Sequence, residues 1–331
     1  MPNDRVTSDD VALRAGVSRS TVSRAFSPGR PVQEETRQRI LRAAQELGYH
    51  PNALAQALTS RRSQIVGIVM GELSNPIHAV LHQSLSHALQ SNGFIPISAQ
   101  LSPPNDADQM IATFRQYQVN VIILTSMNIP ADLVTRIQDA GLQVLLLNRV
   151  DEDGTTASVS ADMNQGGLIA ARYLADRGCR QIVIAQGPNG HWTSRARFAG
   201  HLTGLERMNI TPMDVLKGGY TYEDGAKVAD ILAARRSLPD GILCPNDLFA
   251  IGLMDRLRSS IGSRFPQDMR VIGFDDIPMA NWVGNQLTTI RLPVSAMATR
   301  AAELIARIIA EQEPVHDRIW LPCRLTERAS A

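Results

Sequence analysis

Apolar residues in the first fifty positions recur three or four residues apart, which is the spacing of one face of an α-helix. This spacing predicts a first helix over residues 9–15, which Thr7 or Ser8 can cap with a side-chain oxygen. Gly16 then ends the helix, and Ser18 can cap a second one. Two short helices joined by a glycine turn are typical of a helix-turn-helix unit.

The second predicted helix has an apolar face and a polar face. Its apolar side chains are Val22, Ala25 and Phe26, and its polar ones are Arg19, Ser20, Ser23 and Arg24. Arginine can donate to O6 and N7 of guanine in the major groove, and serine can reach phosphates or base edges. The polar face therefore predicts a DNA-reading helix with Arg19 and Arg24 as base-reading residues, although any solvated helix can carry such residues.

A third helix is predicted from Gln33 to Leu47 and ends at Gly48, which closes a three-helix core. Its apolar stripe consists of Ile40, Leu41, Ala44 and Leu47. Pro51 can open a further short helix over residues 52–58, because a proline at the first helical position loses no hydrogen bond. A helix of that length is not stable alone.

From Ile65 onward, short apolar runs of strand length alternate with amphipathic helical stretches. Strands are predicted at 65–70, 94–99, 121–124 and 144–147, and helices at 77–92, 106–117 and 131–140. After Asp162 come strands at 181–185, 241–244 and 270–274, and helices at 163–177, 195–208, 224–234 and 247–259. This alternation predicts two α/β lobes, each with a parallel sheet and helices on both of its faces.

The last two predicted elements, a helix at 296–311 and a strand near 319–325, have no partner layer of their own. We expect them to return to the first lobe, so that the chain crosses between the lobes three times. Ligands of such folds bind outside the carboxyl ends of the strands, which here face a cleft between the lobes. The predicted domains are a head at 1–50, a hinge and linker at 51–62, and a core at 63–331. Within the core, the first lobe takes about 63–162 and 293–321, and the second lobe about 163–292 and 322–331.

The composition is that of an ordinary globular protein, with 331 residues of which 44% are hydrophobic and 20% charged. No apolar run approaches a membrane span, and the first residues lack the basic start and apolar core of a signal peptide. Cys179, Cys244 and Cys323 are odd in number and far apart, which argues against a disulfide framework or a metal site. We therefore expect a cytoplasmic protein without a metal or cofactor.

The net charge of +1 hides an uneven distribution. Residues 1–62 hold ten arginines and six acidic residues, a net charge of +4, which leaves 23 basic and 26 acidic residues, a net charge of −3, for the remainder. A basic head on a mildly acidic body indicates that only the head meets a polyanion. Because the head is only moderately basic, binding to DNA would need two copies.

Short motifs in the head follow a recognisable order and spacing. They are Asp10-Val11-Ala12, Gly16-Val17-Ser18, Thr21-Val22-Ser23-Arg24, Thr36-Arg37, Leu47-Gly48-Tyr49 and Pro51-Asn52-Ala53 through Leu58. Together they resemble the lactose/galactose repressor family of bacterial transcription regulators. The resemblance implies that residues 52–58 form a hinge helix that orders on operator DNA, and that Leu58 wedges into the minor groove and bends the duplex. The alternative for Leu58 is an ordinary core leucine. The candidate DNA-binding residues are Thr7, Ser18, Arg19, Ser20, Thr21, Ser23, Arg24, Ser27, Asn52, Ala55 and Leu58.

Further motifs in the body are similar to the sugar-binding-protein-like core of the same family. They are Ser74-Asn75-Pro76, Leu147-Asn148-Arg149, Ala161-Asp162, Arg197-Phe198-Ala199-Gly200, Pro245-Asn246-Asp247, Ile272-Gly273-Phe274-Asp275-Asp276 and Leu287-Thr288-Thr289-Ile290-Arg291. The resemblance implies a fold with an all-α helix-turn-helix head and two doubly wound α/β lobes of the periplasmic-binding-protein-like type.

The same resemblance implies a small effector held by Asn148, Arg197, Asn246 and Asp275, with the aromatic ring of Tyr220 over it. The full set of candidate effector-binding residues is Asn75, Asn148, Asp162, Trp192, Arg197, Tyr220, Asn246 and Asp275. Their hydrogen-bonding groups suit a polyhydroxylated ligand and an aromatic face covers its C–H side, so a sugar or sugar acid is favoured over a nucleobase.

Several of these residues have structural alternatives. Arg197 and Asp275 could form a salt bridge between the lobes. Asp162 and the Asn246-Asp247 pair could cap the helices that follow them, and Asp247 is expected to do so. His191 and Trp192 are expected in a loop, where a tryptophan more often meets a ligand or a partner than the core.

The chain also departs from the family pattern at two positions. Leu292 stands where many relatives have glutamine, which removes one polar ligand contact, and Gln33 replaces the serine usual before the third helix, which weakens that cap. The chain ends at Ala331 without an appended tetramerisation helix, so a homodimer is expected.

Three other functions compete with an effector-controlled repressor. An enzyme would need a motif such as a phosphate loop, a dinucleotide fingerprint or a nucleophile elbow, none of which occurs in the sequence. An extracytoplasmic solute-binding protein would need a signal peptide and would not carry the head. A constitutive DNA-binding protein with a vestigial cleft remains open. The sequence thus predicts a cytoplasmic, homodimeric transcription regulator that binds operator DNA, a small polar effector and no membrane.

Overall fold

The computed structural model describes residues 6–26, 31–49, 63–71, 73–101, 106–125, 132–151, 154–311 and 315–331. The chain divides into two compact units, one that contains the head and one that contains most of the α/β body. In the described part, no helix is both long and apolar enough to cross a lipid bilayer.

The head consists of three helices, α1 (Ser8–Ala15), α2 (Arg19–Ala25) and α3 (Glu34–Leu47). Thr7 caps α1 through a capping box with Asp10, Gly16 ends it at a φ of 64°, and Ser18 caps α2 by accepting from the Thr21 N–H. The buried core is formed by Val11, Ala12, Ala15, Val22, Ala25, Ile40, Ala43 and Ala44. The predicted helix-turn-helix and its closing helix are thus confirmed.

Helix α3 follows the expectation at its start and departs from it in its buried face. Gln33 precedes the helix and makes no side-chain capping bond, as its replacement of serine predicts. The predicted apolar stripe is wrong at Leu41, which is exposed, while Ala43 is buried in its place. A small residue fits the contact between closely packed helices of a minimal core, and the larger leucine is left on the solvent side.

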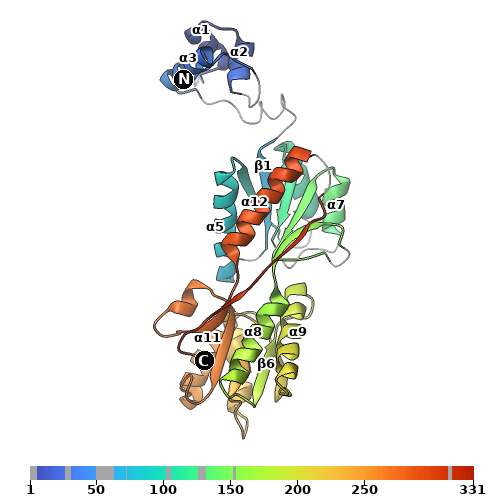
Figure 1. Ribbon diagram of the computed structural model, residues 1–331, viewed down its shortest axis with the longest axis vertical. Coiled ribbons are helices and arrows are strands. Elements are labelled where there is room, and N and C mark those ends of the chain that lie inside the picture. The colour runs from blue at the N-terminus through green and yellow to red at the C-terminus, as the bar shows by residue number, and fades with distance from the viewer. Residues whose placement is uncertain are drawn as a thin grey trace. The chain divides into compact units, whose positions relative to one another are not determined.

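The first lobe of the body contains a six-stranded sheet in the order β11-β5-β4-β3-β1-β2. Its strands are β1 (Ile65–Met70), β2 (Ile95–Gln100), β3 (Val121–Leu124), β4 (Gln143–Leu147), β5 (Ala157–Ala161) and β11 (Arg318–Leu321). Its helices are α5 (Pro76–Ser91), α6 (Asp106–Gln116), α7 (Leu133–Asp139) and α12 (Val294–Glu311), and α12 lies beside α5 on one face of the sheet (Figure 1).

The second lobe contains a six-stranded sheet in the order β12-β10-β9-β8-β6-β7. Its strands are β6 (Ile182–Gln186), β7 (Asp214–Lys217), β8 (Gly241–Leu243), β9 (Arg270–Asp275), β10 (Thr288–Arg291) and β12 (Arg324–Thr326). Its helices are α8 (Met163–Asp176), α9 (Trp192–Arg207), α10 (Tyr222–Ala233), α11 (Asp247–Ile261) and the short 3₁₀ helix η1 (Pro278–Asn281). Figure 1 shows α8 and α9 side by side against this sheet.

The chain passes between the sheets after β5, after β10 and after β11. The expectation of one strand over 319–325 is wrong, because β11 and β12 are separate strands that belong to different sheets. Pro322 lies between them, and a proline cannot donate to a strand ladder. β12 pairs antiparallel with β10, whereas the other described pairings in both sheets are parallel.

Three strands carry no apolar run and were not expected, namely β5, β7 and β10, whose sequences are ASVSA, DVLK and TTIR. β5 and most of β10 are nevertheless buried. Small and hydroxyl-bearing side chains are tolerated there because the neighbouring strands and helices enclose them, which local hydrophobicity does not reveal.

Candidate functional site

Polar residues gather where the strands of the second lobe end. Asp275 is the last residue of β9, and Asn246 and Tyr220 follow β8 and β7. Asn148 follows β4 of the first lobe. Asn148 and Asp275 have positive φ angles of 58° and 115°, a conformation that side-chain-bearing residues rarely adopt. Such strain concentrates at ligand sites, where the surrounding fold imposes it.

Arg197 is the central cation of this region. Its side chain projects from α9, only 6% of the residue is exposed, and the guanidinium carbon lies 4.0 Å from the centre of the Phe274 ring. Its Nη2 approaches the sulfur of Met163 at 3.8 Å, while Nε and Nη1 are buried without any hydrogen-bond partner in the described structure. Burying charged donors without an acceptor is costly, so this position is suited to a polar group brought by a ligand.

Two other candidate effector residues have atoms with that property. The Asn148 Oδ1 and the Tyr220 hydroxyl are buried and have no partner among the described residues. Gly187 allows the Tyr220 ring to come close, because a Cβ at this glycine would lie 2.8 Å from the ring. These three candidate residues therefore offer an amide oxygen that can accept, two guanidinium nitrogens that can donate, and a hydroxyl that can donate or accept a hydrogen bond.

Asp275 lies beside Arg197 in the same lobe, and the structure shows no ion pair between these two described residues. Burial raises the pKa of Asp275 to about 7, although the Arg197 charge and a hydrogen bond from Asn75 lower it. The alternative of a salt bridge between the lobes is wrong, because α9 and β9 both belong to the second lobe. The Asn75 contact, in contrast, reaches Asp275 from the first lobe, where Asn75 caps α5 through the Ile77 N–H.

Two candidate residues, Asp162 and Asn246, have structural roles. Asp162 caps α8 by accepting from the Gln165 N–H at 2.9 Å. Asn246 caps α11 through the Phe249 N–H at 2.8 Å and donates to the Tyr220 carbonyl at 3.0 Å, so it also holds the Tyr220 backbone. In the structure, both side chains therefore cap helices, which was the structural alternative to a ligand contact.

Asp247, which was expected to cap α11, does not. Its carboxylate is fully buried and accepts from the Ile277 N–H at 2.8 Å and from the Thr289 hydroxyl at 2.5 Å. Burial and the charges of Asp275 and Asp276 raise its pKa well above the usual range. Asp247 therefore fixes the backbone just after Asp275 instead of the helix start.

Trp192 was expected in a loop but is the first residue of α9, and His191 precedes it as the cap residue. The Trp192 ring is half-buried and lies 5.2 Å from the ring of Trp320 in the first lobe. It also borders a small cavity of about 140 Å³, which is lined by Arg149, Val150, Gly190, His191, Trp192, Thr193 and Arg195. Sequence patterns identified neither Phe274, which counted only as an apolar strand residue, nor Arg149 and Thr193 as site residues.

The candidate DNA-reading side chains project from α2 as expected. Arg19, Ser20, Ser23 and Arg24 are exposed, while Val22 and Ala25 on the opposite face are buried. Arg19 lies 3.5 Å from Asp9 in an exposed ion pair, and Arg24 donates through Nε to the Ser20 carbonyl at 3.3 Å. Both interactions are weak enough for DNA to replace them.

Hydroxyl groups at the start of the two helices are partly engaged. Thr7 takes part in the capping box, and the Ser18 hydroxyl lies 2.8 Å from those of Ser20 and Thr21. The remaining candidates, Ser27, Asn52, Ala55 and Leu58, lie outside the described residues, as does the predicted hinge helix.

In the described part of the chain, the three cysteines are buried and free, and no cluster of His, Cys, Asp or Glu side chains could hold a metal ion.

Comparisons with known proteins agree with both parts of the chain. Residues 7–52 match the bacterial regulatory proteins of the lacI family, and residues 171–331 match a periplasmic binding protein-like domain. The ribose operon repressor of Bacillus subtilis (strain 168) is 30% identical over 96% of this chain and 95% of its own length. The chain belongs to the lacI family.

Solved structures of this family share the fold. The lac repressor dimer bound to operator and the anti-inducer ONPF has a TM-score of 0.85 at 23% identity and covers 99% of each chain. The transcriptional regulator CelR in complex with cellobiose has a TM-score of 0.75 at 26% identity and covers 99% of this chain and 100% of its own. This lacI-family chain is therefore a DNA-binding transcription regulator and not an enzyme.

Proposed function

We propose that this chain is a cytoplasmic, homodimeric repressor whose operator affinity is controlled by a sugar or sugar acid bound in its body. The observation that carries the proposal is the group of buried, unpartnered polar atoms on Asn148, Arg197 and Tyr220. Native proteins rarely leave such atoms unpaired, and a polyhydroxylated ligand could pair all of them at once.

The surroundings of these atoms favour a sugar over a flat nucleobase. Arg197 and Asp275 provide charged donors and acceptors for hydroxyl groups, and Tyr220 provides one aromatic surface. A nucleobase would stack best between two aromatic rings. The Phe274 ring is already covered by the Arg197 guanidinium, so it cannot serve as a second ring opposite Tyr220. Two of the similar proteins point the same way, since one is named for a ribose operon and another, a structural neighbour, is solved with cellobiose.

Operator binding by a homodimer rests on the exposed polar face of α2 and on the lac repressor, which binds its operator as a dimer. A moderately basic head gains affinity when two copies contact adjacent half-sites.

The proposal is tested by titrating the purified protein with ribose, cellobiose, galacturonate and hypoxanthine in a calorimeter, and by operator gel shifts with each compound. We expect one of the first three to bind and to change operator affinity. Tight binding of hypoxanthine alone would overturn the ligand class. If no compound in a wider metabolite screen raises the melting temperature, the cleft is vestigial and DNA binding is constitutive.

Replacing Arg24 with alanine is expected to weaken specific operator binding by roughly 1–3 kcal/mol, because a bidentate contact to guanine contributes about that much discrimination. Binding to random DNA should stay nearly unchanged. Gel shifts on operator and random duplexes at one salt concentration measure both quantities. Equal losses on the two duplexes would instead make Arg24 a phosphate contact.

Effector affinity should depend on pH through Asp275. A sugar hydroxyl that donates to this carboxylate needs the ionised form, and the Asp275 pKa lies near 7. The ionised fraction rises about tenfold between pH 6 and pH 8, so the association constant should rise about tenfold as well. Calorimetry across this range provides the measurement. In the Asp275→Asn variant the remaining affinity should be independent of pH, and a slope that persists there would point to another group.

A further inference from the structure

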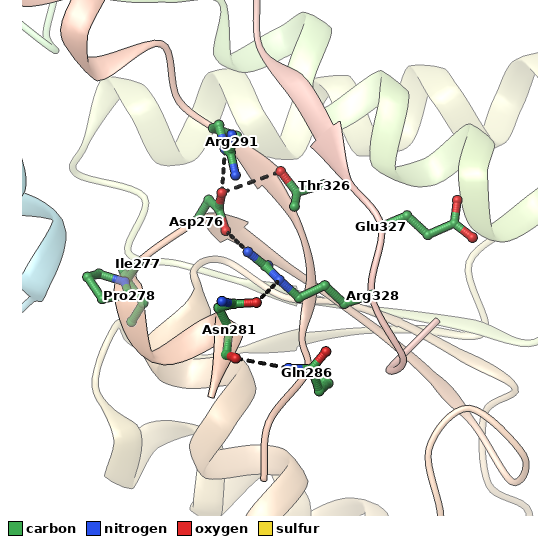
Figure 2. A pocket seen from close by; sticks show the side chains of 9 residues that line it. All are labelled: Asp276, Ile277, Pro278, Asn281, Gln286, Arg291, Thr326, Glu327 and Arg328. Atoms are coloured by element: carbon green, nitrogen blue, oxygen red, sulfur yellow. Dashed lines mark hydrogen bonds and ion pairs between the residues drawn. The ribbon is translucent and has the colours of Figure 1, made fainter. Parts of the chain in front are cut away.

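A polar groove of about 570 Å³ lies on the second lobe, and its lining begins at Asp276, directly after the candidate effector residue Asp275. It is lined by Asp276, Ile277, Pro278, Asn281, Gln286, Arg291, Thr326, Glu327 and Arg328 (Figure 2). All its charged side chains come from three segments, the end of β9, the end of β10 and the carboxyl-terminal stretch that begins with β12.

Asp276 is the centre of this groove. Its side chain is only 6% exposed and accepts from Arg291 Nε at 2.5 Å and from Arg328 Nη2 at 2.6 Å. The Thr326 hydroxyl adds a longer contact of 3.4 Å. Figure 2 shows the two arginines approaching the carboxylate from different sides, while Glu327 points away from it. We call Asp276, Arg291 and Arg328 the crossover clamp.

Within the crossover clamp, Arg328 also contacts other residues of the second lobe. Its side chain is 10% exposed and also donates to the Leu287 carbonyl at 2.7 Å and to the Asn281 amide oxygen at 3.3 Å. Arg291, in contrast, is 58% exposed, and Asp276 is the partner that its guanidinium contacts. A buried carboxylate with two arginine donors resists displacement more than an exposed ion pair does.

The clamp joins two of the three places where the chain passes between the lobes. Arg291 is the last residue of β10, directly before residues 292–293 lead into α12 of the first lobe. Arg328 follows β12, which the chain enters through residues 322–323 after leaving β11 of the first lobe. Asp276 therefore ties together the second-lobe ends of both crossovers.

The clamp is also one peptide bond from the effector site. Asp275 and Asp276 have positive φ angles of 115° and 60°, and the next amide, that of Ile277, is held by the buried Asp247. Asp247 additionally binds Thr289 in β10, the strand that carries Arg291. Because Asp247 holds the Ile277 amide in place, a shift of the backbone at Asp275 would move Asp276 relative to Arg291 and Arg328.

We propose that the crossover clamp transmits the state of Asp275 to the two crossovers and thereby regulates how effector occupancy changes the arrangement of the lobes. This inference rests on the proposed function for its biological role, but the mechanical link does not need an effector. Coupling requires an element that both sites bias, and the clamp is shared by the effector-site strand β9 and by the crossovers.

The link is tested first without ligand, by a double-mutant cycle on the melting temperature with Asp275→Asn and Arg291→Gln. Asp275 and Arg291 are paired residues of the neighbouring strands β9 and β10, so direct coupling between them has to be separated from coupling through Asp276. The cycle is therefore repeated in an Asp276→Asn background, where coupling through the clamp should disappear and direct coupling should persist. The clamp predicts a double variant whose shift departs from the sum by roughly 2–4 °C. Arg291 is mostly exposed, so its variant should fold.

Glu327→Gln is the matched control. It removes a charge from the lining of the same groove, but Glu327 pairs with Arg177 and not with the clamp. Asp275→Asn combined with Glu327→Gln should therefore be additive. Additivity in the Arg291 cycle as well would overturn the proposal, whatever the effector proves to be.

The second arm uses whichever of ribose, cellobiose and galacturonate binds the wild-type protein. In Arg291→Gln, affinity for that compound and operator affinity without it should each stay within about threefold, while the ratio of operator affinities with and without the compound should fall at least fivefold. A merely structural role would lower the melting temperature without changing that ratio, and an unchanged ratio would contradict regulation by the clamp. If none of the three binds, the proposed effector class fails, and the ligand-free cycle still decides the mechanical link.

Discussion

Replacing Arg197 with alanine is expected to abolish the effect of the effector on operator binding while operator affinity in its absence stays near wild type. The guanidinium is buried over Phe274, and its Nε and Nη1 have no acceptor in the described structure. Hydrogen bonds between charged donors and a ligand contribute about 1.5–3 kcal/mol each, so effector affinity should fall at least a hundredfold. Calorimetric titration measures the affinity, and operator gel shifts with and without effector measure the response.

Two further variants separate this role from a structural one. Arg207→Ala removes an exposed arginine from the end of the same helix and should leave the effector response intact. Arg197→Met keeps an apolar contact with Phe274 and relieves an unpaired buried charge, so it should lose effector binding without a fall in melting temperature. An undiminished response in either Arg197 variant would place the effector elsewhere.

Replacing Gly200 with valine is expected to destabilise the body more than any surface change. A Cβ at this position would lie 2.1 Å from the Asn164 carbonyl oxygen, so α9 would have to move away from α8. Overpacking of this kind costs about 1–3 kcal/mol or more, and the melting temperature should fall by roughly 5–10 °C. Thermal unfolding followed by circular dichroism checks the shift.

The same variant should weaken effector binding, because Arg197 lies one turn earlier on α9 and moves with the helix. Gly284→Ala is the control, since a Cβ there meets nothing within 4 Å and its φ is not positive. A stable Gly200→Val protein with normal effector affinity would show that the close approach of α8 and α9 is not needed to position Arg197.

Local rules were sufficient for much of the head and for the order of most elements in the body. The Thr7 and Ser18 caps and the outward face of α2 were predicted correctly, because they depend on residues three or four positions apart. The apolar strands and amphipathic helices were likewise found from periodicity. Asn148, Arg197 and Asp275 were named only through resemblance to a family, since no local pattern marks them as neighbours.

Long-range packing decided the rest. Leu41 lies outside the core because Ala43 fits the helix contact, and β5 and β10 are strands because their neighbours enclose small polar residues. The tasks of Asp247 and Asp276 depend on partners 15 to 52 residues away along the chain. Hydrogen bonds over such distances are set by how strands align in a sheet and by where the chain crosses between lobes, and neither is encoded in the spacing of neighbouring residues.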